Sequence, residues 1–183
     1  MKRLLFLLLI LLPSGVLSEP TLIVDIQEKG KARITYEIKD VENIANLTQT
    51  IRDPMVQAIV GERMASLFCW AIDDFFIVPQ EDRITINVDC AEFAKKVGGT
   101  WETEAKNLTN IKPVTIIINL PRESNLISAE PEPDEVRDNS LVWREVKYIP
   151  KVVYKEEGYP MGYGVVFLIV IAGIFLILWK RRK

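Results

Sequence analysis

A charge-free run near the carboxyl end constrains this chain more than any other feature. Residues 162–179 contain no charged side chain, and the basic residues 180–183 follow directly. As a helix, eighteen residues extend ~27 Å, close to the hydrocarbon thickness of a bilayer. Tyr163 and Trp179 lie where interfacial aromatics belong, and basic flanks stay on the cytoplasmic side. We therefore predict a transmembrane helix over residues 162–179 and a cytoplasmic tail over residues 180–183. A buried core helix is the alternative, and the basic tail argues against it.

The amino-terminal segment has the pattern of a secretory signal. Lys2 and Arg3 precede an apolar run over residues 4–12, Pro13 breaks it, and Ser18 supplies a small residue. This order predicts a signal peptide over residues 1–18, cleaved after Ser18. An uncleaved anchor is the alternative, but such a run spans only about half of a bilayer.

Residues 19–160 are then one domain outside the cytoplasm. They hold all 25 acidic residues and 17 basic ones, because six of the 23 basic residues lie at the two ends of the chain, so their net charge is −8. Phosphate backbones attract basic surfaces. Nucleic acid is therefore excluded as an expected partner.

The first part of this domain predicts a hairpin and a helix. Residues 21–28 and 31–39 are β-rich and flank Lys29-Gly30. Asp53-Pro54 is a helix-start signal, and the following periodicity predicts one long amphipathic helix to about Ile72. Its broad apolar stripe comprises Val56, Ile59, Val60, Met64, Leu67, Trp70 and Ala71. Small residues with Cys69 and Ile72 gather on the other side.

The second part is predicted to be rich in strands. Residues 83–90 alternate strictly, placing Ile84, Ile86, Val88 and Cys90 on one face. Asp89 and Glu92 resemble a capping box, which predicts a short helix over residues 91–97 that ends at Gly98-Gly99. Further strands are expected over residues 100–104, 114–120, 126–131, 140–146 and 150–156. The expected fold class is α+β, with a mainly antiparallel sheet.

One segment resembles a known family. Leu120-Pro121, Ile127-Ser128-Ala129, Pro131 and the run Asn139 to Trp143 resemble the repeats of immunoglobulin-like β-sandwiches in prokaryotic surface proteins. The match covers about forty residues, and a long helix occurs where those repeats have only strands. The chain as a whole also resembles uncharacterised archaeal single-span membrane proteins. These resemblances imply an extracellular β-fold and assign no binding residue.

Cys69 and Cys90 are the only cysteines, and both lie in the exported part, where thiols oxidise. Cys69 falls on the small-residue face of the predicted helix and Cys90 on the apolar face of a strand. We predict that they form a disulfide, with two buried free thiols as the alternative. A nucleophilic thiol is disfavoured because the chain has no histidine to activate it.

Two N-x-Thr sequons begin at Asn46 and Asn107. In an exported chain both are candidate glycosylation sites. Their polar surroundings fit exposed loops. Such triplets also arise by chance, so their use stays open.

Carboxylates gather at Asp73-Asp74, Glu81-Asp82 and residues 130–138. Paired carboxylates can hydrolyse glycosides or bind Ca²⁺. Adjacent residues, however, point their side chains apart, and no calcium-loop or phosphate-loop pattern is present in the sequence. We interpret these clusters as solvated surface and predict no catalytic residue, metal ligand or cofactor.

The sequence thus predicts a membrane-anchored interaction or structural module, or an accessory subunit of a membrane complex. Its expected partners are the bilayer, through residues 162–179, and a membrane or cell-surface protein. The alternative is an envelope hydrolase that uses carboxylates alone. Convergent buried carboxylates would favour the hydrolase, and dispersed exposed ones the module.

Overall fold

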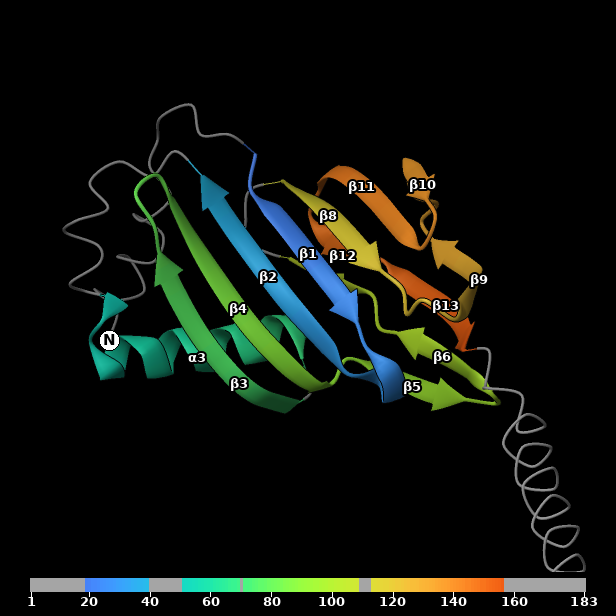
Figure 1. Ribbon diagram of the computed structural model, residues 1–183, viewed down its shortest axis with the longest axis horizontal. Helices are drawn as coiled ribbons and strands as arrows, with labels where there is room; N and C mark the ends of the chain where they lie inside the picture. Colours follow the sequence, from blue (N-terminus) through green and yellow to red (C-terminus); the bar gives the residue numbers. More distant parts are fainter. Residues whose placement is uncertain (1–18, 40–50, 70, 109–112, 157–183) are drawn as a thin grey trace, which may run out of the picture.

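The computed structural model describes residues 19–39, 51–69, 71–108 and 113–156 (Figure 1). Within them the structure has no helix that is both long and apolar enough to cross a membrane. The predicted signal peptide 1–18, the predicted span 162–179, the tail 180–183 and Asn46 lie outside the described residues.

The larger sheet has seven strands. In spatial order they are β10 (Glu135–Arg137), β11 (Ser140–Val146), β8 (Val114–Asn119), β1 (Thr21–Ile26), β2 (Ala32–Lys39), β4 (Arg83–Glu92) and β3 (Ala71–Pro79). Neighbours pair antiparallel, as expected, except that β1 and β8 are parallel. The predicted hairpin is confirmed as β1 and β2, joined by the short 3-10 turn η1 (Glu28–Gly30).

A second layer packs on one face of this sheet. It consists of a four-stranded sheet, a two-stranded pair and one α-helix, α3 (Pro54–Phe68). The four-stranded sheet has the order β5 (Ala94–Val97), β6 (Thr100–Thr103), β13 (Lys151–Glu156) and β9 (Ser124–Glu130). The pair is β7 (Lys106–Asn107) with β12 (Tyr148–Ile149). In Figure 1, α3 lies behind β3 and β4, and the smaller sheet lies at the right of the view, away from β3.

The core lies between these two layers. Even-numbered residues of β1, β2, β4 and β8 point inward, because successive side chains of a strand alternate between faces. Val24, Ile34, Val88 and Ile118 are wholly buried there. The second layer contributes Val60, Met64, Phe68, Ile149, Val152 and Tyr154 to the same cluster.

The start of α3 follows the sequence prediction. The Asp53 carboxylate accepts a hydrogen bond from the Met55 N–H at 2.8 Å, which is an N-cap contact. At Gly61 the missing Cβ leaves room for the Phe75 ring, whose nearest carbon would be 3.3 Å from a Cβ built there. The helix therefore lies close against β3.

Two predictions about helices are wrong: the end of the long helix, and the existence of the short one. The helix ends at Phe68 instead of Ile72, because Ala71–Pro79 pairs with β4 as strand β3. The predicted short helix over residues 91–97 is also absent from this described segment: β4 continues to Glu92, and Ala94–Val97 forms β5. Gly98 and Gly99 both have positive φ and form a tight two-residue hairpin turn instead of a helix end.

The segment that resembles an immunoglobulin-like repeat crosses between the layers. β9 lies in the smaller sheet, whereas β10 and β11 lie in the larger one. Trp143 is buried, and its indole N–H donates to the Pro131 carbonyl at 3.1 Å. The β-rich, two-layered arrangement is compatible with a β-sandwich.

Candidate functional site

The larger sheet presents a second face that the core does not use. We call it the open face. It comprises the odd-numbered residues of β1, β2, β4 and β8 together with Asp74, Phe76 and Val78 of β3 and Ser140 and Val142 of β11. Figure 1 looks onto this face, with α3 behind the sheet. No helix or strand of the described segments packs against it.

One row of side chains, which is apolar at both of its ends and which we call the apolar row, crosses the middle of the open face. The strand register aligns Val142, Ile117 and Ile23 on β11, β8 and β1. The same row continues through Thr35 and Asn87 to Phe76 at the β3 edge. The Thr35 hydroxyl donates to the Asn87 side-chain oxygen at 3.1 Å, so a polar pair separates the two apolar ends. Phe76 is 42% exposed and Val78, two residues on, is 38% exposed. Water therefore reaches large apolar groups at the β3 end of this row, whereas Val142 at the other end is buried.

A hydrogen-bonded row runs beside the apolar one. The Ser140 hydroxyl donates to the Asn119 side-chain oxygen at 2.6 Å, and the Asn119 amide donates to Asp25, also at 2.6 Å. On the next strands, the Arg33 guanidinium donates to both oxygens of Asp89 at 2.7 and 3.2 Å. This two-pronged contact raises the pKa of Arg33 and fixes its planar group on the sheet.

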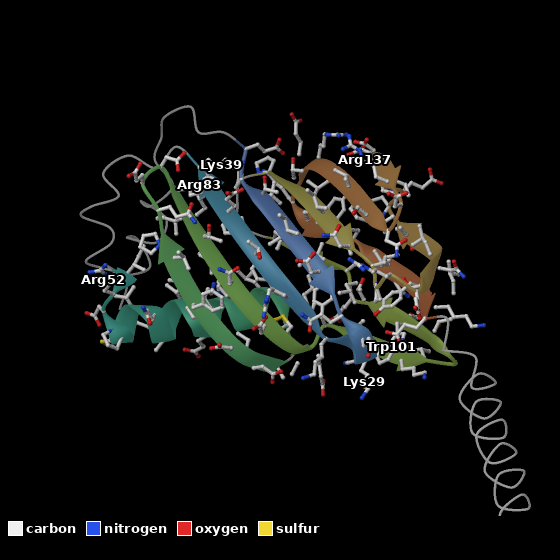
Figure 2. The ribbon with its side chains drawn as sticks, in the orientation of Figure 1. Lys29, Lys39, Arg52, Arg83, Trp101 and Arg137 are labelled. Carbon is white, nitrogen blue, oxygen red and sulfur yellow. A yellow bond between two sulfur atoms is a disulfide. The ribbon has the colours of Figure 1, made fainter. Side chains whose placement is uncertain are left out.

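A second charged group flanks the apolar row at the opposite end of the strands. Glu37 accepts from Arg83 at 2.9 Å and pairs with Lys39 at 3.3 Å. Figure 2 places Lys39 and Arg83 together at this end of the face. The open face thus combines apolar side chains, a hydrogen-bonded Thr35–Asn87 pair between them, and flanking charges that are already paired with neighbours on the sheet.

The free edge of β3 is less suited to contact than the face. Gln80 donates its N–H to the Arg83 carbonyl, so even-numbered residues of β3 point their N–H groups toward β4. Of the outward positions, Pro79 has no N–H, and the N–H of Phe75 donates to the Asp74 carboxylate at 2.8 Å. Proline and charged side chains are common means of preventing strand addition at an edge.

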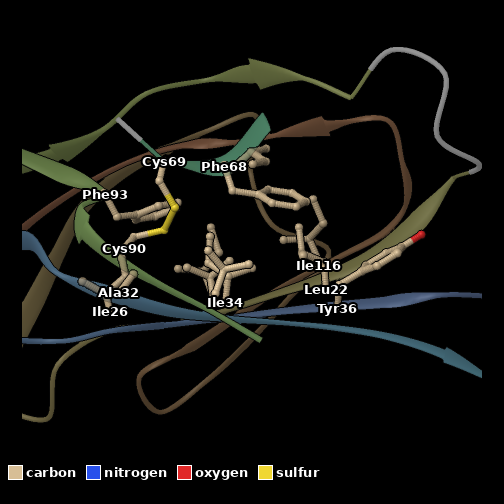
Figure 3. Close-up of a cluster of buried hydrophobic side chains, with 14 of the residues drawn as sticks. Leu22, Ile26, Ala32, Ile34, Tyr36, Phe68, Cys69, Cys90, Phe93 and Ile116 are labelled. Carbon is tan, nitrogen blue, oxygen red and sulfur yellow. A yellow bond between two sulfur atoms is a disulfide. The ribbon is translucent and has the colours of Figure 1, made fainter. Parts of the chain in front are cut away.

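The predicted disulfide between Cys69 and Cys90 is confirmed. Cys69 follows the last residue of α3, and Cys90 lies on the inner face of β4, with a Cα–Cα distance of 5.6 Å. Figure 3 shows the bond beside Phe93 and above Ile34. Closing a loop of 21 residues stabilises a fold by ~3 kcal/mol, and here it ties the helix to the sheet.

Of the two sequons, only Asn107 lies among the described residues. It is exposed, but it belongs to β7, where it pairs with Tyr148, and not to a loop. Leu108, the middle residue of the sequon, is buried. Modification of Asn107 stays a prediction.

The acidic clusters are dispersed over the surface. Asp73 pairs with Lys31 at 3.2 Å, and both side chains are about half exposed. Arg83 lowers the pKa of Asp82 by hydrogen bonding, and Arg137 and Arg144 do the same for Glu135. No three acidic or cysteine side chains within the described ranges are grouped to hold a metal ion.

Sequence reasoning did not identify the open face. Its signal is the alternation of Arg33, Thr35 and Glu37 with buried residues in β2. Which polar residues become neighbours depends on the strand order, and Asn119 and Asp25 are 94 positions apart.

No protein-family model matches the sequence, and a search of curated proteins finds no match.

Proposed function

We propose that this chain is a membrane-anchored module outside the cytoplasm, which binds a membrane or cell-surface protein through the open face. The anchor is the predicted span 162–179. The exported domain, residues 19–160, would carry the contact.

The main observation in support of this proposal is the composition of the open face. Protein interfaces combine an apolar centre with a polar rim. The apolar row supplies Ile117, Ile23 and Phe76 around the hydrogen-bonded Thr35–Asn87 pair. The pairs Arg33–Asp89 and Arg83–Glu37 supply the charged flanks. Because these charges are already paired, association would not require ordering them afresh.

The carboxylates on this face favour contact over hydrolysis. Asp25, Asp89 and Glu37 each accept a hydrogen bond from a neighbouring side chain on the sheet. They act there as positioning groups within the surface.

The test is position-specific photo-crosslinking in native membranes. The full chain would carry a photoreactive residue at Thr35 in the centre of the open face, or at Ala58, an exposed position on α3. We expect a discrete protein adduct from Thr35 and none from Ala58. Adding Phe76→Ser should lower the Thr35 adduct several-fold, because a 42% exposed ring contributes more to a contact than to folding. Equal adducts at both positions would refute the assignment of this face.

A further inference from the structure

We propose that the turn of the β5–β6 hairpin, with Val97, Lys96 and the adjacent Lys155, docks on the anionic headgroups of the bilayer that anchors the chain. This inference rests on the proposed anchor and adds a second, peripheral contact with the membrane. The hairpin turn is a separate region from the residues at the centre of the open face, which are proposed to bind the protein partner.

The β5–β6 turn lies beside the end of β13, the last strand of the described residues. β13 pairs antiparallel with β6, with Tyr154 opposite Trp101. Continuing that register by two residues brings Glu156, the last residue of β13, level with Gly99 in the hairpin turn. Figure 1 shows the end of β13 on the same side as the β5–β6 turn.

The length of chain between β13 and the predicted span limits their separation. Six residue steps connect Glu156 to residue 162. A fully extended chain covers at most ~3.3–3.6 Å per residue, so the end of β13 lies within ~20 Å of the start of the span. The hairpin turn is therefore within reach of the headgroup region.

The chemistry of the hairpin suits an anionic lipid surface. Residues 94–101 contain Lys95 and Lys96 and no acidic residue, although the domain as a whole is acidic. Glu156, which the register places beside the turn, is only partly exposed and has one buried carboxylate oxygen. Val97 is 52% exposed, and Lys155 is exposed on the neighbouring strand. Anionic headgroups attract lysine side chains, and the apolar Val97 can enter the interface beside them.

The hairpin turn extends into solvent, and the packed Trp101 side chain lies at its base. A Cβ built at Gly98 or Gly99 would meet no atom within 4 Å, so the turn extends into open space. Beneath it, the Lys96 ammonium lies 5.8 Å from the centre of the Trp101 ring, which is within cation–π range. Figure 2 places Trp101 and the exposed Lys29 of η1 at this same end.

The β3–β4 turn, at the opposite end of β4, is an acidic turn that can serve as a control. The β3–β4 turn contains Glu81 and Asp82, both exposed, and β4 runs from there to the hairpin end. An anionic surface would repel this turn.

The test uses the full chain reconstituted in vesicles without any protein partner. A photoreactive residue replaces Val97 or, as the control, Glu81. The vesicles contain phosphatidylcholine either mixed with phosphatidylglycerol or alone. We expect Val97 to label lipid in the mixed vesicles at several times the yield of Glu81. Lys96→Gln with Lys155→Gln should lower that yield several-fold, and should have little effect in phosphatidylcholine alone.

Two results would overturn the proposal, and they have different consequences for the membrane anchor. A chain that floats with the vesicles but labels lipid equally from Val97 and Glu81 refutes the hairpin contact and leaves the anchor standing. A chain that does not float with either kind of vesicle refutes the anchor and the hairpin contact together. Binding through the open face is independent of both results, because no protein partner is present.

Discussion

At the residue scale, Tyr36 links core packing to pH. Its side chain lies on the inner face of β2, and burial raises its pKa from 10.0 to about 12. The folded state then holds the phenol proton more tightly than the unfolded state does. This stabilisation is complete below about pH 10 and is lost as the pH rises toward 12, by roughly 2–3 kcal/mol. Burial and the charge of Glu156 also raise the pKa of Tyr154.

Replacing Tyr36 with Phe should therefore flatten the alkaline loss of stability. Phe has no proton to lose, so the free energy of unfolding of Tyr36→Phe should fall less steeply between about pH 10 and pH 12 than that of the native chain. Denaturant unfolding at several pH values in this range measures the difference. Parallel curves for the two proteins would show that Tyr36 does not titrate with a raised pKa.

At the scale of elements, η1 and the β5–β6 hairpin depend on one glycine. Gly30 has φ +73°, and its carbonyl accepts from the Phe93 N–H at 2.9 Å. A Cβ at Gly30 would overlap the Ala94 carbonyl oxygen and the Trp101 ring. Gly98 also has a positive φ, of +56°, but a Cβ there would meet nothing.

Alanine substitutions at these two glycines should therefore differ in cost. Gly98→Ala adds only backbone strain, about 1–2 kcal/mol. Gly30→Ala adds steric overlap to a similar strain, and we expect about 2–4 kcal/mol. Denaturant midpoints of both variants provide the comparison. Equal destabilisation would mean that η1 and the hairpin move apart readily.

The same elements show what sequence patterns could predict. Strict alternation identified the inner face of β4, and export together with the expected faces of Cys69 and Cys90 identified the disulfide. The run Ala94–Val97 contains good helix formers, but pairing with β6 supplies its backbone hydrogen bonds, so tertiary context overrides local preference. Likewise, the pairing of β3 with β4 ends the periodic helix pattern at Phe68.

At the scale of the whole molecule, the two layers leave one face of the large sheet free. This result depends on long-range topology, because the parallel pairing of β1 with β8 brings Ile23 beside Ile117. The helix and the smaller sheet both pack on the inner face, and the disulfide ties the end of the helix to β4. Sequence patterns predict the alternation within each strand, but not which strands become neighbours.

The central claim is that a protein partner covers the open face in the native membrane. The most direct measurement compares labelling of Phe76→Cys and Ala58→Cys by a membrane-impermeant thiol reagent, in intact native membranes and in the purified full chain. We predict that Phe76→Cys is protected in membranes and labelled after purification, while Ala58→Cys is labelled in both. Equal labelling of Phe76→Cys in membranes and in the purified chain would contradict the account.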